Sequence, residues 1–148
     1  MRIWHTDLLP YLPDLQFNGQ WRELVSIMRD LKNKGKTNHL LINRVCEYED
    51  AGLRLASYAS IYFRCRARRY GFCSLNGFEE FYELDKRFYD CIYEKPYIDW
   101  HNDEYLRVCM ANLYEKHKFG VGKSRITDEE WLRICDGYKK ITGEEYKI

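Results

Sequence analysis

Prolines are so few, and so placed, that most of the chain can form helices. The 148-residue sequence contains only Pro10, Pro13 and Pro96, so no proline interrupts residues 14–95. Because proline is the residue that most strongly breaks a helix, this interval can be helical wherever the apolar spacing favours it. No stretch alternates apolar and polar residues as a half-buried strand does. The sequence therefore predicts an all-α fold.

Several segments have the three- and four-residue apolar spacing of amphipathic helices. The strongest is 46–70, which is followed by Gly71 as a C-terminal stop. The last begins with Thr127 and Glu130 at the spacing of a capping box. The expected helices are 15–34, 46–70, 77–92, 103–118 and 126–142. We expect about five helices in a single compact domain that spans residues 1–148.

The cysteines and histidines lack the spacing of a metal or redox site. No two of the 6 cysteines are spaced as C-x-x-C, and no two of the 4 histidines as H-x-x-x-H. Glycine-rich nucleotide loops and Ser-His-Asp signatures are also missing. The chain shows no signal peptide and no apolar run of membrane-spanning length. We therefore predict a cytoplasmic protein with reduced thiols, without metal or cofactor, and not bound to a membrane.

The net charge of the whole chain does not indicate a nucleic-acid partner. The formal net charge is +1, so DNA binding would depend on local basic patches. One candidate is RCRARRYGF, residues 64–72, in which Arg64 and Arg68 share the polar face of the predicted helix. Such a cluster at a helix end usually complements the helix dipole and aids solubility. Contact with DNA phosphates is the alternative.

Glu23 lies on the polar side of the first predicted helix. A rotation of about 100° per residue places it roughly opposite the apolar stripe centred on Trp21, on the face that also carries Gln16 and Asp30. Periodicity alone therefore describes a solvated carboxylate. If a second layer of protein or a ligand covered that face, the same position would be the wall of a site. The helical pattern leaves both readings open.

Two histidines fall in predicted loops. His39 follows the stretch GKTN, and His101 follows YIDW. Histidines in loops beside polar residues are candidates for a functional site. Capping or structural hydrogen bonding is the alternative for each of them.

The start of the chain resembles a known family of DNA-repair enzymes. MRIWHTDLLPYLP is close to the MRLWH..LLP.LP opening of a broad branch of the pyrimidine-dimer DNA glycosylase and AP lyase family, typified by phage endonuclease V. That family continues with Q-x-R-E, which residues 20–23 (QWRE) match, and with a loop that carries N-H, as residues 38–39 do. Segments 50–72 and 96–116 resemble the family's long helix and the helix before its DNA-contacting tail. The resemblance covers about residues 1–118.

The resemblance implies a metal-independent, endonuclease V-like enzyme that acts on damaged double-stranded DNA. The N-terminal α-amine, here that of Met1, would attack the sugar C1′, displace the base and form a Schiff base, and β-elimination would then cleave the strand. An α-amine suits this role because its ordinary pKa near 8 leaves roughly 10–20% of it unprotonated at neutral pH. Glu23 would hold charge near the ring-opened sugar and help to move the C2′ proton.

The resemblance also implies the DNA contacts. Arg22 would hold a phosphate of the kinked strand, and a base must leave the stack for the amine to reach C1′. The expected DNA-binding residues are Arg2, Arg22, His39, Arg64, Arg68, Lys118 and Lys123. The residues expected to support the site are His5, Gln20 and His101. We expect a monomer that is nucleoid-associated in a prokaryote or encoded by a phage.

Some departures from the family pattern keep a second hypothesis open. Ser26 replaces a second basic residue, Gln16 replaces a histidine, and Arg2 favours retention of Met1 where the best-known members expose a small residue. The alternative is a helical module on the same scaffold that has lost the chemistry. It would bind nucleic acid or a protein partner through its basic segments.

Overall fold

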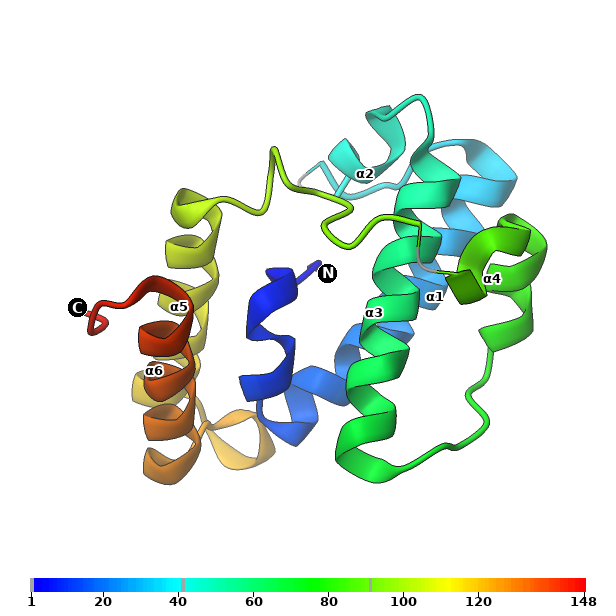
Figure 1. Ribbon diagram of the computed structural model, residues 1–148. Helices are drawn as coiled ribbons and strands as arrows, with labels where there is room; N and C mark the ends of the chain where they lie inside the picture. Colours follow the sequence, from blue (N-terminus) through cyan, green and yellow to red (C-terminus); the bar gives the residue numbers. More distant parts are fainter. Residues whose placement is uncertain (1, 41, 91) are drawn as a thin grey trace. The chain divides into compact units, whose positions relative to one another are not determined.

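The chain folds almost entirely into helices. The computed structural model describes residues 2–40, 42–90 and 92–148, and it contains no strand within those ranges. The α-helices are α1 (Asp14–Lys34), α2 (Arg44–Glu47), α3 (Ala51–Tyr70), α4 (Phe78–Leu84), α5 (Asp103–Phe119) and α6 (Asp128–Thr142) (Figure 1). The 3-10 helices are η1 (Thr6–Tyr11), η2 (Lys86–Asp90) and η3 (Gly122–Ser124). The predicted all-α fold is confirmed.

Two of the predicted helices are shorter than expected. The segment 46–70 was expected to be continuous, but Tyr48 is extended, with φ −69° and ψ 142°, and α3 begins only at Ala51. The segment 77–92 is interrupted at Asp85, whose backbone is also extended. The Asp85 carboxylate accepts the backbone N–H of Arg87 at 2.9 Å. This local turn competes with the helix, which explains why α4 ends there and η2 follows.

Contacts along the chain define two compact units, and the predicted single-domain organisation stays a prediction. Unit 1 comprises the residues up to Ile3 together with Gly19–Tyr97, and unit 2 comprises Trp4–Asn18 together with Ile98–Ile148. The helix α1 therefore contributes its first turn to unit 2 and the rest to unit 1.

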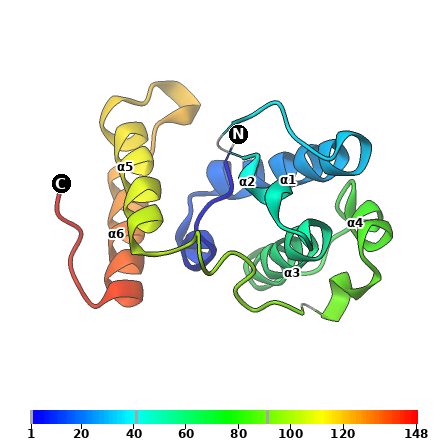
Figure 2. The same ribbon diagram turned by 90° about the horizontal axis from the view of Figure 1, so that it is seen from above.

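The core of unit 1 is built on the aromatic face of α3. Trp21 of α1 stacks on Tyr62 of α3 with ring centroids 5.6 Å apart, and it also packs against Phe81 of α4. The Trp21 indole N–H donates to the Asn76 carbonyl at 2.8 Å, which satisfies the polar atom of this buried ring. The helices α3 and α4 lie side by side in the view from above (Figure 2). Because Trp21 holds one face of α1 in the core, Glu23 projects from the opposite side.

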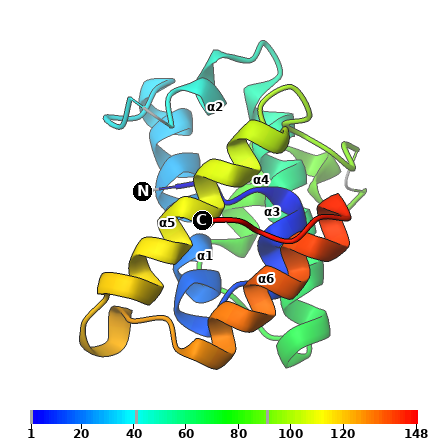
Figure 3. The same cartoon turned by 90° about the vertical axis from the view of Figure 1, so that its left-hand side faces the viewer.

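Unit 2 is built from η1, α5 and α6. The helix α5 packs beside α6, as Figures 1 and 2 both show. The short helix η1 packs against α6 (Figure 3). His5 caps η1 by accepting the backbone N–H of Asp7. Periodicity did not predict η1, because a single 3-10 turn with Pro10 inside it has no amphipathic repeat to detect.

A glycine allows η1 to approach α6 closely. A Cβ atom added to Gly137 would lie 2.3 Å from Cγ of the Tyr11 ring. Gly137→Ala is therefore expected to destabilise the fold by about 1–3 kcal/mol, because the ring or the helix must move. In Gly52→Ala the new methyl group meets Leu84 at an ordinary 3.7 Å, so this control should be neutral or stabilising. Urea denaturation of both variants checks the difference, and equal effects would contradict it.

An ion pair near the start of α3 should make stability depend on pH. The Asp50 carboxylate accepts a short hydrogen bond from the Tyr93 hydroxyl and pairs with Arg54 at 2.7 Å. Together these hold the pKa of Asp50 below its ordinary value. The stabilisation is therefore fully present above the unfolded-state pKa of about 3.9 and is lost as the pH falls through the lower folded pKa.

The melting temperatures of wild type and Asp50→Asn should show this dependence. We expect a clear difference between the two melting temperatures at pH 7 and down to about pH 4, which narrows as the pH falls below about 4, because protonated Asp50 resembles Asn. The matched control is Glu49→Gln, which changes the exposed neighbouring carboxylate. A difference in melting temperature between wild type and Asp50→Asn that stays constant down to about pH 3 would show that the ion pair of Asp50 does not cause the pH dependence.

The described cysteines are free, and the reduced state of the thiols stays a prediction. They are Cys46, Cys65, Cys73, Cys109 and Cys135, and Cys91 lies outside the described residues. Burial raises the pKa of the thiols of Cys46, Cys65 and Cys135, so these groups are weak nucleophiles at neutral pH. Within the described ranges, no helix has the length and apolar character needed to cross a membrane.

Candidate functional site

The beginning of the chain is hydrogen-bonded to Glu23. The backbone N–H of Arg2 donates to Oε2 of Glu23 at 2.8 Å, and both residues are half-buried. Among the described residues, this N–H is the only hydrogen-bond donor to the carboxylate. Periodicity placed Glu23 on the solvated side of α1, and the structure places the N-terminal segment of unit 1 over that side. The carboxylate therefore lies beside the backbone nitrogen of residue 2.

A buried polar chain holds the same segment from the other side of its backbone. The side-chain amide of Gln20 donates to the Arg2 carbonyl at 2.8 Å, and its oxygen accepts the Tyr58 hydroxyl at 3.2 Å. Gln20 is 1% exposed and Tyr58 is fully buried. Since both polar groups of the Arg2 backbone are bound by side chains, the position of this residue is strongly constrained. Removing one partner would leave a buried polar group unsatisfied.

Tyr58 is a member of this cluster that the sequence did not reveal. Its apolar spacing marks it as a core residue of α3, and it is one. A buried tyrosine usually finds a hydrogen-bond partner for its hydroxyl, but nothing in the spacing indicates that the partner is Gln20, 38 positions earlier. Gln20 itself was predicted to support the site, and its contact with Arg2 gives that prediction a geometric basis.

This cluster can position a carboxylate, as a general base, beside the N-terminal segment. A half-buried carboxylate with one oxygen bound to a backbone N–H keeps its other oxygen for a substrate proton or a developing positive charge. Met1, the predicted nucleophile, lies outside the described residues. No group of three or more potential metal ligands occurs among the residues that the structure describes.

The predicted DNA-binding residues divide between the two units. Arg22 is exposed on α1, next to Glu23, and His39 is exposed in the loop after α1. The loop backbone is held by the His39 carbonyl, which accepts the N–H groups of residues 42 and 43 at 3.0 Å. Arg64 and Arg68 are exposed on α3 in the same unit.

Arg2, also in unit 1, is half-buried. Lys118 and Lys123 belong to unit 2, at the end of α5 and in η3, and both are exposed. The exposure of the six residues other than Arg2 leaves their side chains accessible to a polyanion. Their role in DNA binding stays a prediction.

His5 and His101 form a structural pair within unit 2. Nδ1 of His5 accepts the Asp7 N–H, so Nε2 carries the proton that is donated to the His101 carbonyl at 2.9 Å. Nδ1 of His101 in turn accepts the Thr6 N–H at 3.1 Å, and the two rings stack 5.2 Å apart. Each Nδ1 atom therefore acts as a hydrogen-bond acceptor for a backbone N–H. These contacts fix η1 to the segment before α5, and a direct role in catalysis stays a prediction.

Comparison with known proteins gives one match. Residues 1–70 match the family described as pyrimidine dimer DNA glycosylase. The match contains the described cluster of Arg2, Gln20, Glu23 and Tyr58. No curated protein and no solved structure matches the chain significantly. The resemblance noted for residues 71–118 therefore stays a prediction.

Proposed function

Over residues 1–70 the chain matches the pyrimidine dimer DNA glycosylase family, and on this premise we propose that it is a DNA glycosylase with AP lyase activity on damaged duplex DNA. The substrate would be DNA with a pyrimidine-dimer-like lesion or an abasic site. The observation that carries the proposal is the 2.8 Å hydrogen bond from the Arg2 backbone to Glu23. It fixes a carboxylate next to the beginning of the chain, where this chemistry needs one.

The α-amine of Met1 is the proposed nucleophile. Three covalent bonds separate that nitrogen from the Arg2 nitrogen, so standard backbone dimensions limit the distance between them to about 4 Å. An α-amine with an ordinary pKa near 8 is unprotonated in roughly 10–20% of molecules at neutral pH, against well under 0.1% for an ordinary lysine. The proposal requires residue 1 to be the N-terminus of the mature protein, which intact mass spectrometry measures.

The reaction proceeds in two stages. The amine nitrogen bonds to C1′, the N-glycosidic bond breaks, and the base leaves; opening of the sugar ring then gives an imine. Glu23 next removes a proton from C2′, whose electron pair forms the C2′–C3′ double bond as the C3′–O bond to the phosphate breaks. The leaving phosphate carries the electrons away, and hydrolysis of the imine by water restores the amine. The carboxylate also stabilises the positive charge of the protonated imine.

Basic residues of unit 1 are proposed to hold the DNA. Arg22 lies one position before Glu23 and would bind a phosphate next to the reacting sugar. Arg2, His39, Arg64 and Arg68 would extend this contact over unit 1. We also propose that the protein acts as a cytoplasmic monomer.

Borohydride trapping tests the proposal. The protein is mixed with duplex DNA that contains one abasic site, and sodium borohydride then reduces any imine to a stable amine. We expect a covalent protein–DNA adduct whose cross-linked peptide contains Met1. The absence of an adduct, from protein whose intact mass shows an unmodified N-terminus, would falsify the mechanism.

A second candidate function is a binding module without the chemistry. It is favoured by Ser26, which is exposed on α1 where the family carries a second basic residue, and by the net charge of only +1. Salt-dependent binding to DNA without an adduct would support this alternative. The absence of any DNA binding would point to a protein partner.

A further inference from the structure

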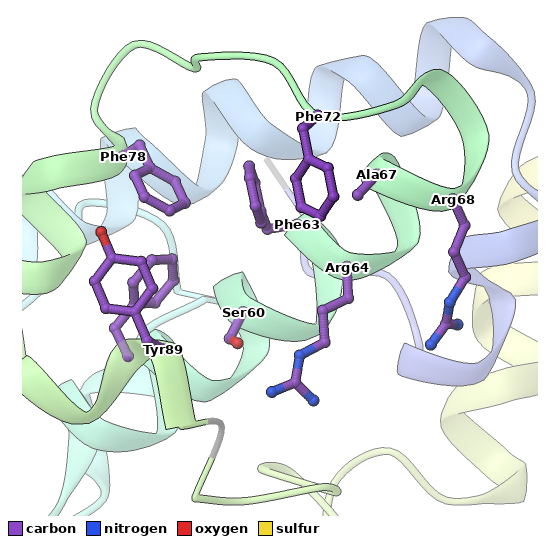
Figure 4. A pocket seen from close by; sticks show the side chains of 9 residues that line it. Ser60, Phe63, Arg64, Ala67, Arg68, Phe72, Phe78 and Tyr89 are labelled. Carbon is purple, nitrogen blue, oxygen red and sulfur yellow. The ribbon is translucent and has the colours of Figure 1, made fainter.

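Unit 1 contains an open pocket with a volume of about 490 Å³ between α3, α4 and η2 (Figure 4). Most of its wall is aromatic, and two arginines lie at its rim. The side chains that matter are Phe63, Phe72, Phe78, Tyr89, Arg64 and Arg68. Among the described residues that line the pocket, none carries a carboxylate.

The aromatic wall is assembled from separate segments and stays open to solvent. Phe63 of α3 packs against Phe78 of α4 with ring centroids 4.6 Å apart, and Phe78 packs edge-on against Tyr89 of η2 at 5.7 Å. Phe72 is 89% exposed and Tyr89 is 55% exposed. Large aromatic rings exposed together around a cavity are typical of a binding surface.

The end of α3 places Phe72 at this wall. Gly71 has φ +80°, a conformation that L side chains rarely adopt, and its N–H donates to the Ala67 carbonyl at 2.8 Å. The chain therefore turns directly after the helix, and the Phe72 ring comes to 6.3 Å from the ring of Phe63. Figure 4 shows the two rings next to each other over α3.

Two arginines supply positive charge at the rim of the pocket. Arg64 and Arg68 lie one turn apart, and both guanidinium groups extend from α3 in the same direction (Figure 4). Among the described residues, neither forms an ion pair. Like charges at this spacing weaken a helix, although the C-terminal end of the helix dipole offsets part of this cost. An anionic ligand would relieve the repulsion.

We propose that this pocket binds one unstacked nucleobase of a DNA strand, with the adjoining phosphate held by Arg64 and Arg68. Stackable rings beside paired guanidinium groups are the combination that binds single-stranded DNA, since every base has an aromatic face and every linkage an anion. A purely apolar peptide would use the wall and leave the arginines unpaired. The inference deepens the proposed function and rests on it in taking DNA as the ligand, but it does not require the amine chemistry.

A fluorescent base tests the pocket directly. A short single-stranded oligonucleotide with one central 2-aminopurine is titrated with the full-length protein, and stacking of that base on an aromatic ring quenches its fluorescence. We expect quenching with wild type. In Phe72→Ala we expect loss of most of the quenching and roughly 10-fold weaker binding. This side chain is almost fully exposed, so its truncation should leave the fold intact.

Two further variants separate stacking from charge. Arg64→Gln combined with Arg68→Gln should weaken binding and reduce its dependence on salt, because two phosphate contacts are lost. Leu132→Ala, which removes an apolar side chain of α6 that is 68% exposed, is the control and should leave both quenching and binding unchanged.

If Phe72→Ala quenches the probe as strongly as wild type does, the proposed base-binding role of the pocket is wrong. It is also wrong if the wild-type protein fails to quench the probe, and an apolar protein partner would then be the occupant. An adduct with abasic DNA but no quenching would contradict base binding in the pocket and support the proposed function. Quenching without an adduct would support base binding in the pocket and contradict the proposed amine chemistry.

Discussion

Glu23→Gln is expected to form the trapped adduct with abasic DNA but to cleave the strand at least about 100-fold more slowly than wild type. The amine attack does not need the carboxylate to accept a proton, whereas removal of the C2′ proton does. The amide has nearly the same shape and can still accept the Arg2 N–H through its oxygen, so the N-terminal segment should stay in place. Single-turnover cleavage and borohydride trapping, measured on the same preparation, separate the two steps.

The control for this variant is another carboxylate on the same helix. Asp30 lies further along α1, where its contact is an ion pair with Lys34 at 3.7 Å. Asp30→Asn should trap and cleave like wild type. If Glu23→Gln cleaved as fast as Asp30→Asn, Glu23 would not be the base, and its bond to Arg2 would be only structural.

The helices themselves were largely predictable from the sequence. α1 was predicted within one residue at its start, because its apolar residues repeat over several turns and Pro13 precedes it. The end of α3 was predicted from Gly71, and the start of α6 from Thr127, whose capping box is present. These signals are local: each depends on residues within one or two turns of each other.

The breaks within the predicted helices were not predicted, because they depend on the hydrogen bonds and ion pairs that polar side chains form. Asp85 binds the Arg87 N–H and ends α4, and Asp50 uses its carboxylate for Arg54 and for Tyr93, 43 positions later. An aspartate in a helical pattern does not show which of these partners it will take. The spacing of the apolar residues around it is the same in either case.

The candidate site was predictable only through the family resemblance. Periodicity placed Glu23 on a polar face and could not indicate that Arg2, 21 positions earlier, covers it. The family resemblance suggested Glu23 and Gln20, but not Tyr58. The aromatic pocket was not predicted at all, because Phe63, Phe72 and Tyr89 come from separate elements whose meeting depends on the tertiary fold.

Adding one residue before Met1 is expected to abolish the adduct and strand cleavage while leaving DNA binding unchanged. The contact with Glu23 is made by the Arg2 amide, which the extension does not alter, so the segment should keep its position. The reactive amine, however, is displaced by up to about 3.8 Å. Attack on C1′ needs a separation of about 3–3.5 Å, and a misplacement of about 1 Å can already cost 100-fold. We therefore expect at least that loss in the rate of trapping.

The matched control is the same extended protein after a protease has removed the extra residue, which should recover the adduct. Thermal melting and salt-dependent DNA binding of both forms show whether the fold and the DNA contacts are preserved. Adduct formation by the extended protein at the wild-type rate would mean that the nucleophile is another amine, which sequencing of the cross-linked peptide would identify. A lysine would then need its ordinary pKa of about 10.4 lowered by several units. The Arg2–Glu23 bond matters here because it holds the backbone of residue 2 in place, so that a shift of a single residue becomes a measurable change in rate.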